Sequence, residues 1–316
     1  MFELYKKRQL GDYIVDTFSF FKTFGKHFFK IFFIINGAFL LIVGALVFFF
    51  LKSNFQAVIN ESLDHPESDN LAGYFNDNFG LLIGFIVLFF VVIIALSLFN
   101  STYPILYLKL VDQKSKNNFT TEDVVTIFRQ NLWKIIKFCF GLIFLVVPML
   151  FVVIILLFFL CFLIVGIPLL LIAIPTLFTW VNFSFYTYLS EDKGFFQSLN
   201  HAYLLLKKDF WTSIGATFLI LIMMQMIQGS ITMVFYFAGI FMFFLTALGS
   251  SEFNPETMGD SPFLIFFLTF IFILIFTLSN IFNNMIMINQ GIMYYSLGAE
   301  EKISNSEIEL IGTDNE

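Results

Sequence analysis

The sequence predicts an all-α integral membrane protein, and three observations predict it. Apolar residues make up 59% of the 316 residues and charged residues only 13%, so too few polar side chains remain to cover a water-soluble surface. The charges are confined to short segments. Between these segments lie uncharged stretches at 31–51, 78–108, 138–190, 210–251 and 261–299, and each has at least the roughly 20 residues that a helix needs to cross a bilayer.

These stretches predict six membrane spans, at approximately 31–51, 80–106, 139–164, 168–189, 213–247 and 263–290. The stretch at 138–190 would form a helix about 80 Å long, more than twice the roughly 30 Å hydrocarbon core, so the chain must turn back within it. Gly166 and Pro168 mark this turn. A break at "QGS", residues 228–230, would instead divide the fifth span and give seven segments.

Lysine and arginine are distributed unequally between the two sides that these spans define. All 17 except Lys52 lie before the first span, at 109–137, at 191–209 or in the tail. The positive-inside rule therefore places both termini in the cytoplasm. The first 30 residues lack the short apolar core of a cleaved signal peptide. Abundant Phe, Ile, Asn and Lys are typical of an AT-rich bacterial genome, so we expect a multi-pass protein of the bacterial inner membrane.

Three segments combine an apolar stripe at helical spacing with cations on the other faces, and each ends in a polar residue followed by two large apolar residues. These endings are His27-Phe28-Phe29, Asn131-Leu132-Trp133 and Asp209-Phe210-Trp211. Such helices lie in the cytoplasmic membrane interface, with the residues at 26–33 forming the hinge into the first span. Thr120 is the predicted N-cap of the second. The predicted lipid or partner surface consists of Lys22, Lys26, Phe29, Arg129, Trp133, Lys207, Lys208 and Trp211.

The second, fourth and sixth spans lead back to the cytoplasm, and their ends also resemble one another. Asn100, Asn182 and Asn289 are each followed six or seven residues later by a tyrosine, which we expect at the interface. The chain therefore divides into three parallel hairpin repeats, each preceded by an amphipathic interfacial helix, at 11–108, 120–190 and 194–297. The remaining residues, 298–316, read as a flexible acidic cytoplasmic tail, and the whole chain as one membrane domain.

The opening run "LGDYIVDTFSFFKTFGKHFFKIFF" carries a Leu-Gly, a Thr-Phe and an aromatic-basic segment before the first span. In this it resembles bacterial multispanning proteins related to the membrane region fused to some glycerophosphodiester phosphodiesterases. The later run "EDKGFFQSLNHAYLLLKKDFW" looks like the second recurring piece of that family. Members of the group are mostly of unknown function, so the resemblance implies no catalytic residue.

The pattern of ionisable residues does not predict an enzyme. No Asp, Glu, Lys, Arg or His lies in any predicted span, whereas pumps and intramembrane hydrolases use such groups at depth. The histidines lack cysteine or carboxylate neighbours at the spacing of metal ligands, and we expect His27 and His201 on polar interfacial faces. Cys139 and Cys161 are about 33 Å apart along one helix and cannot form a disulfide with each other. We expect no catalytic residue, no metal, no cofactor and no nucleic acid partner.

Amide side chains are the polar groups that remain inside the predicted membrane region. They can bind helices together, or they can meet near the axis and line a recess that opens to the cytoplasm. The candidate recess residues are Asn100, Asn182, Asn280, Asn283, Asn284 and Asn289.

Two functional hypotheses follow, and a lipid-modifying enzyme ranks below both because no acid, base or nucleophile can be placed. The first is a non-enzymatic subunit or scaffold that binds membrane lipids, anionic at the cytoplasmic leaflet, or a protein partner through its interfacial helices. The second is a channel or carrier for an uncharged or amphipathic solute, with the asparagines along its path.

Overall fold

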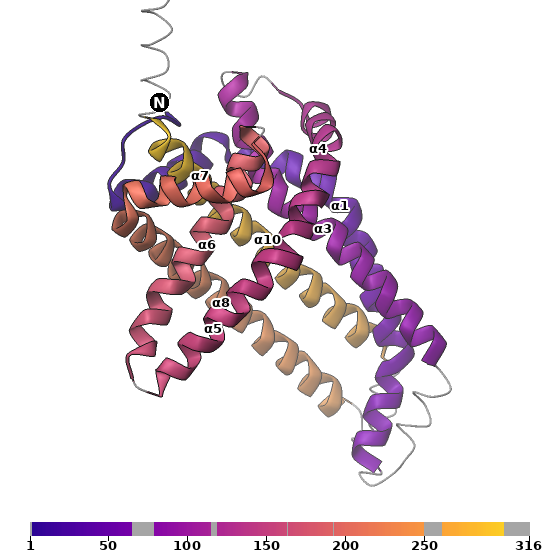
Figure 1. Cartoon of the computed structure of the whole chain (residues 1–316). Helices are drawn as coiled ribbons and strands as arrows, with labels where there is room; N and C mark the ends of the chain where they lie inside the picture. Colours follow the sequence, from indigo (N-terminus) through magenta and orange to yellow (C-terminus); the bar gives the residue numbers. More distant parts are fainter. Residues whose placement is uncertain are drawn as a thin grey trace, which may run out of the picture. The chain divides into compact units, whose positions relative to one another are not determined.

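The computed structural model describes residues 2–64, 79–114, 119–162, 164–191, 193–249 and 261–299. All regular structure in these ranges is helical (Figure 1). The helices are α1 (Leu10–Asp64), α3 (Phe79–Gln113), α4 (Thr121–Gly141), the π-helix η1 (Leu142–Val146), α5 (Val147–Cys161), α6 (Gly166–Ser190), α7 (Phe195–Lys208), α8 (Phe210–Gly249) and α10 (Pro262–Leu297).

Six helical segments are long and apolar enough to cross a membrane. They are Leu10–Ser53, Phe79–Gln113, Thr121–Cys161, Gly166–Ser190, Phe210–Leu245 and Pro262–Leu297. Each contains one of the six predicted spans, or almost all of it. The prediction of an all-α protein with several membrane-spanning helices is therefore confirmed. The loops at 65–78 and 250–260, and the tail from residue 300, lie outside the described residues.

Two of the three segments expected as interfacial helices run into their spans without a hinge. Helix α1 is continuous from Leu10 to Asp64, so helical structure passes through 26–33 without a break. No proline interrupts this stretch, and every turn can keep its backbone hydrogen bonds. The segment before the fifth span is interrupted at Asp209, whose non-helical backbone (φ −142°) separates α7 from α8.

The segment before the third span begins at the predicted N-cap, Thr120. The hydroxyl group of Thr120 accepts a hydrogen bond from the backbone N–H of Asp123, and the Asp123 carboxylate accepts one from the backbone N–H of Thr120 at 2.8 Å. This reciprocal pair satisfies two backbone donors at the start of α4. The helix then widens into the π-turn η1 directly before Pro148. Proline lacks the N–H group that an α-helical turn requires, which favours a local rearrangement of this kind.

The turn inside the long uncharged stretch is also where it was predicted. Helix α5 ends at Cys161 and α6 begins at Gly166, so the two form a hairpin (Figure 1). A Cβ atom on Gly166 would lie 2.2 Å from the backbone nitrogen of Cys161, so only glycine fits this close approach. The alternative break at 228–230 is absent, because α8 is helical throughout these residues.

The chain forms two compact units, and four helices contribute to both. Unit 1 comprises residues 1–31, 100–224 and 283–316, and unit 2 comprises residues 32–99 and 225–282. Aromatic side chains fill the interior of unit 1. Phe28 lies 4.6 Å from the ring of Tyr103 and 4.8 Å from that of Tyr107, measured between centroids, and all three side chains are fully buried. The expectation that Tyr107 and Tyr295 face the interface is wrong, because both are buried.

Helices α3, α6 and α10 approach one another closely at Gly291. A Cβ atom there would lie 2.2 Å from Cδ1 of Leu108 and 2.4 Å from the hydroxyl oxygen of Tyr186. The same tyrosine donates a hydrogen bond of 2.7 Å to the backbone carbonyl of Met287. Since Leu108 belongs to α3 and Tyr186 to α6, glycine at position 291 permits this three-helix contact.

We predict that Gly291→Ala destabilises the protein in mild detergent. Its methyl group has no space between Leu108 and Tyr186, and overpacking of this kind costs about 1–3 kcal/mol. Gly25→Ala is the matched control, because its methyl group would meet only Phe21 at an ordinary 3.6 Å. Thermal unfolding of both variants checks the prediction. Equal unfolding midpoints for Gly291→Ala and Gly25→Ala would contradict this three-helix contact.

Candidate functional site

A polar pocket of about 470 Å³ lies in unit 1 where the C-terminal ends of α3, α6 and α10 come together with α7. It also receives one side chain from the segment before α1. Its walls consist of Tyr5, Lys109, Asp112, Gln113, Ser190, Glu191, Lys193, His201, Leu205, Tyr294, Tyr295 and Gly298. The pocket thus contains two carboxylates, two ammonium groups, an imidazole and three phenols.

The segment before α1 is held against the pocket by Tyr5 and Arg8. The hydroxyl group of Tyr5 donates to Oδ2 of Asp112 at 3.0 Å, and its ring meets that of Tyr295 edge to face, with 5.4 Å between centroids. Burial, together with the negative charge of Asp112, raises the pKa of Tyr5, so the phenol stays protonated and remains a donor. The buried guanidinium of Arg8 donates to Asp16 at 2.8 Å and to the backbone carbonyl of Leu4 at 2.8 Å.

Glu191 contacts several other residues of the pocket wall. Its Oε1 accepts a hydrogen bond from the hydroxyl group of Tyr294, and its Oε2 lies 2.7 Å from Nζ of Lys193. The imidazole of His201 approaches Oε2 to 3.9 Å, and its other nitrogen lies 3.2 Å from the hydroxyl group of Thr187. Glu191 therefore joins the end of α6 to both α7 and α10.

Lys109 links the C-terminal end of α3 to this cluster. Its ammonium group donates to the backbone carbonyl of Leu189 at 2.6 Å. The last carbonyl groups of a helix have no partner within the helix and carry partial negative charge, so a cation from α3 stabilises the end of α6. In the described ranges, no cluster of three or more His, Cys, Asp or Glu side chains could hold a metal ion. The arrangement can bind charged groups.

The six predicted recess residues are distributed over several separate contacts. Asn284 donates to the amide oxygen of Asn100, so these two meet as expected. Asn289 instead donates to the backbone carbonyl of Tyr13 at 3.1 Å and to the hydroxyl group of Thr17 at 2.9 Å, which ties α10 to α1.

Two other predicted recess residues donate within their own helices. Asn182 and Asn280 each donate to a carbonyl of their own helix, at 2.8 Å to Phe178 and to Phe276 respectively. Asn283 is half-buried, and Asn280 belongs to unit 2 whereas the other five belong to unit 1. The structure thus brings Asn100 and Asn284 together.

The predicted basic and aromatic surface is largely exposed. Lys22, Lys26, Arg129, Lys207 and Lys208 are exposed, and Phe29 is half-buried. Trp133 and Trp211 expose 66% and 70% of their surface. Lys208 also lines a second, smaller pocket of about 280 Å³, together with Lys7, Arg8, Tyr13, Asp209, Ser296 and Leu297.

The two histidines expected on polar interfacial faces both make specific contacts. One ring nitrogen of His27 lies 2.8 Å from the hydroxyl group of Tyr107, and the other lies 3.0 Å from the backbone carbonyl of Phe119. His201 lines the polar pocket. The sequence analysis did not identify Tyr5, Asp112 or Glu191 as site residues. Asp112 and Glu191 each lie just after a predicted span, where charged residues are common, and Tyr5 carries no such signal.

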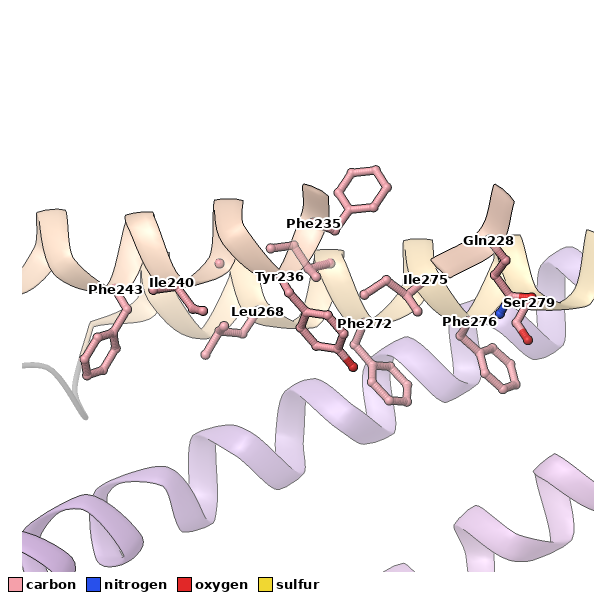
Figure 2. A pocket seen from close by; sticks show the side chains of 12 residues that line it. Gln228, Phe235, Tyr236, Ile240, Phe243, Leu268, Phe272, Ile275, Phe276 and Ser279 are labelled. Carbon is pink, nitrogen blue, oxygen red and sulfur yellow. The ribbon is translucent and has the colours of Figure 1, made fainter. Parts of the chain in front are cut away.

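A third pocket, of about 680 Å³, lies between α8 and α10 in unit 2 (Figure 2). Its walls are mainly apolar, with Phe235, Ile240, Phe243, Leu268 and Phe272 among the lining residues. Gln228 and Ser279 place polar groups together at one end, as Figure 2 shows. An elongated apolar pocket with polar groups at one end suits an amphipathic molecule.

Comparisons with protein-family models, with curated proteins and with the solved structures found no match to this chain.

Proposed function

We propose that this chain is a non-enzymatic protein of the bacterial inner membrane that binds anionic lipids at the cytoplasmic leaflet. The observation that carries the proposal is the exposure of cations opposite buried apolar side chains on the helices that precede the spans. On α1, Lys22 and Lys26 are exposed while Phe24 and Phe28 are buried. On α7, Lys207 and Lys208 are exposed while Leu206 is buried.

Exposed tryptophans beside these cations support a membrane surface as the partner. Trp211 is the second residue of α8 and lies three residues after Lys208, and Trp133 lies four residues after Arg129 on α4. Trp side chains anchor at the depth of lipid headgroups, and each Lys or Arg near an anionic leaflet contributes about 1 kcal/mol of attraction. A protein partner would have to displace lipid from the same residues.

Three parallel repeats remain part of this proposal. The segments before the first, third and fifth spans would form a ring of amphipathic helices around the cytoplasmic side, and the returning helices α3, α6 and α10 would form its centre. Their contact at Gly291 supports such a centre, since it involves one returning helix from each proposed repeat.

We predict that the quadruple variant Lys22→Gln, Lys26→Gln, Lys207→Gln and Lys208→Gln loses anionic lipid during purification in mild detergent. At about 1 kcal/mol per cation, the retained phosphatidylglycerol should fall at least tenfold. Quantitative mass spectrometry of the bound lipid measures the effect. The matched control replaces the same four residues by arginine, which keeps the charge and should keep the lipid. Equal lipid retention by the glutamine and arginine variants would refute the proposal.

The apolar pocket between α8 and α10 favours a second candidate, a carrier for an amphipathic solute. Gly239 lines this pocket, and a Cβ atom there would meet Cδ1 of Ile271 at an ordinary 3.5 Å. Position 239 therefore accepts alanine, whereas a large side chain would enter the pocket.

We predict that, if the chain is a carrier, Gly239→Phe abolishes the flux of a fluorescent amphipathic solute in liposomes while Gly239→Ala preserves it. A triple alanine variant of Asn100, Asn182 and Asn284 tests in the same assay whether the asparagines contribute to the path. No flux above that of protein-free liposomes, or equal flux for both Gly239 variants, would remove the carrier as a candidate.

A further inference from the structure

The polar pocket of unit 1 has no part in the proposed binding through surface cations. From its charges we infer that it is a binding site for a zwitterion that carries an ammonium group and a phosphate. The headgroup of phosphatidylethanolamine and small soluble molecules with the same two groups share this chemistry. The site goes beyond the proposed surface and does not depend on it.

One part of the pocket wall suits the ammonium group. Asp112 and Glu191 supply carboxylates, and the phenols of Tyr5 and Tyr294 donate to them, which fixes their orientation. Tyrosine rings attract cations through their faces. The raised pKa of Tyr5 keeps that phenol uncharged, so it adds no anion to the site.

Helix ends strengthen the preference for a positive group in the same place. Helix α3 ends at Gln113, α6 at Ser190 and α10 at Leu297, and residues at or beside each end line the pocket. The C-terminus of a helix carries the equivalent of about half a negative charge in its unpaired carbonyl groups. Lys109 binds one of these carbonyls, that of Leu189, which shows that this region accepts an ammonium group.

The two lysines supply the complementary charge for the phosphate. Lys193 is partly exposed, with 35% of its side chain accessible, and its ammonium group pairs with Glu191 at 2.7 Å. A zwitterion can place its ammonium group against Glu191 and its phosphate against Lys193, and thereby replaces one ion pair by two.

The balance of charges excludes simpler ligands. Two carboxylates would repel a lone phosphate, and two lysines would repel a lone ammonium ion, whereas a molecule with both groups offers a partner to each sign of charge in a pocket whose own formal charges balance. The volume of about 470 Å³ suffices for a headgroup, and the polar side chains around it do not suit an acyl chain.

The test uses the full chain in nanodiscs and isothermal titration with three soluble probes. Phosphoethanolamine carries both charges, ethanolamine only the ammonium group, and inorganic phosphate only the anion. We expect phosphoethanolamine to bind at least about tenfold more tightly than either single-charge probe, since two charge-assisted contacts replace one. Equal affinity for phosphoethanolamine and for a single-charge probe would overturn the proposal.

Two variants and one control assign the binding to this pocket. Glu191→Gln and Lys193→Gln should each weaken phosphoethanolamine binding about tenfold, while Lys52→Gln, an exposed lysine of unit 2 outside the pocket, should leave it unchanged. Lys193 is exposed enough that its replacement should not impair folding, and an unaltered unfolding temperature checks this for both variants. Wild-type affinity in Glu191→Gln and Lys193→Gln would place the binding elsewhere and overturn the proposal.

The composition of the nanodiscs distinguishes the two sources of the zwitterion. If the ligand is a lipid headgroup, phosphoethanolamine should bind in phosphatidylglycerol discs and be outcompeted in phosphatidylethanolamine discs. If it is a soluble molecule, the affinity should be the same in both. Absence of binding in both kinds of disc would overturn the site. The quadruple lysine variant, tested on retained phosphatidylglycerol, reports separately on the surface proposal.

Discussion

The hydrogen bond from Tyr186 to the backbone carbonyl of Met287 lies at the contact on which the interior of unit 1 depends. It joins α6 to α10 at a point where Gly291 allows Leu108 of α3 to approach as well. A fully buried phenol needs such a partner, since an unpaired hydroxyl group in a membrane interior costs several times more free energy than a weak contact contributes. Because the three helices meet there, their C-terminal ends a turn further on converge, and that convergence forms the polar pocket.

Buried polar groups in unit 1 are otherwise used mainly to connect helices. Asn289 binds α1 through Tyr13 and Thr17, and the hydroxyl groups of Thr179 and Thr217 meet at 2.7 Å between α6 and α8. Such contacts contribute about 0.6–2 kcal/mol each in a membrane. This distribution favours amides as structural links in unit 1. The charged groups that could recognise a ligand lie instead at the helix ends, and this separation supports a binding role over transport through the centre of that unit.

The six spans and their turn could be predicted because they depend on local properties of the chain. The length of an uncharged stretch predicts a span, Gly166 predicts a turn, and Thr120 predicts a helix cap with Asp123. None of these predictions depends on how the rest of the protein packs. The burial of Tyr107 and Tyr295 could not be predicted in this way, because which face of a helix meets its neighbours is decided by tertiary packing. The segment at 26–33 shows the same limit: its composition suits an interface, yet α1 continues through it.

The polar pocket was missed for a related reason. Tyr5, Asp112, Glu191 and Tyr294 come from four segments far apart in the sequence, and none lies at a spacing that indicates a site. His201 was placed on a polar face, which is consistent with its partial exposure, but its proximity to Glu191 depends on how α7 packs against α6. Asn284 meets Asn100 as expected, whereas Asn289 binds α1, because helical spacing alone does not say which neighbour each amide faces.

We propose that the chain binds lipid rather than a protein subunit at its cytoplasmic side. Native mass spectrometry of the protein extracted from its own membrane into nanodiscs or mild detergent, with all bound species identified, distinguishes the two. We expect defined phospholipids retained in stoichiometric amounts, with no second protein. A stoichiometric protein partner with no retained lipid would contradict it, and would identify the exposed lysines and tryptophans as a subunit interface.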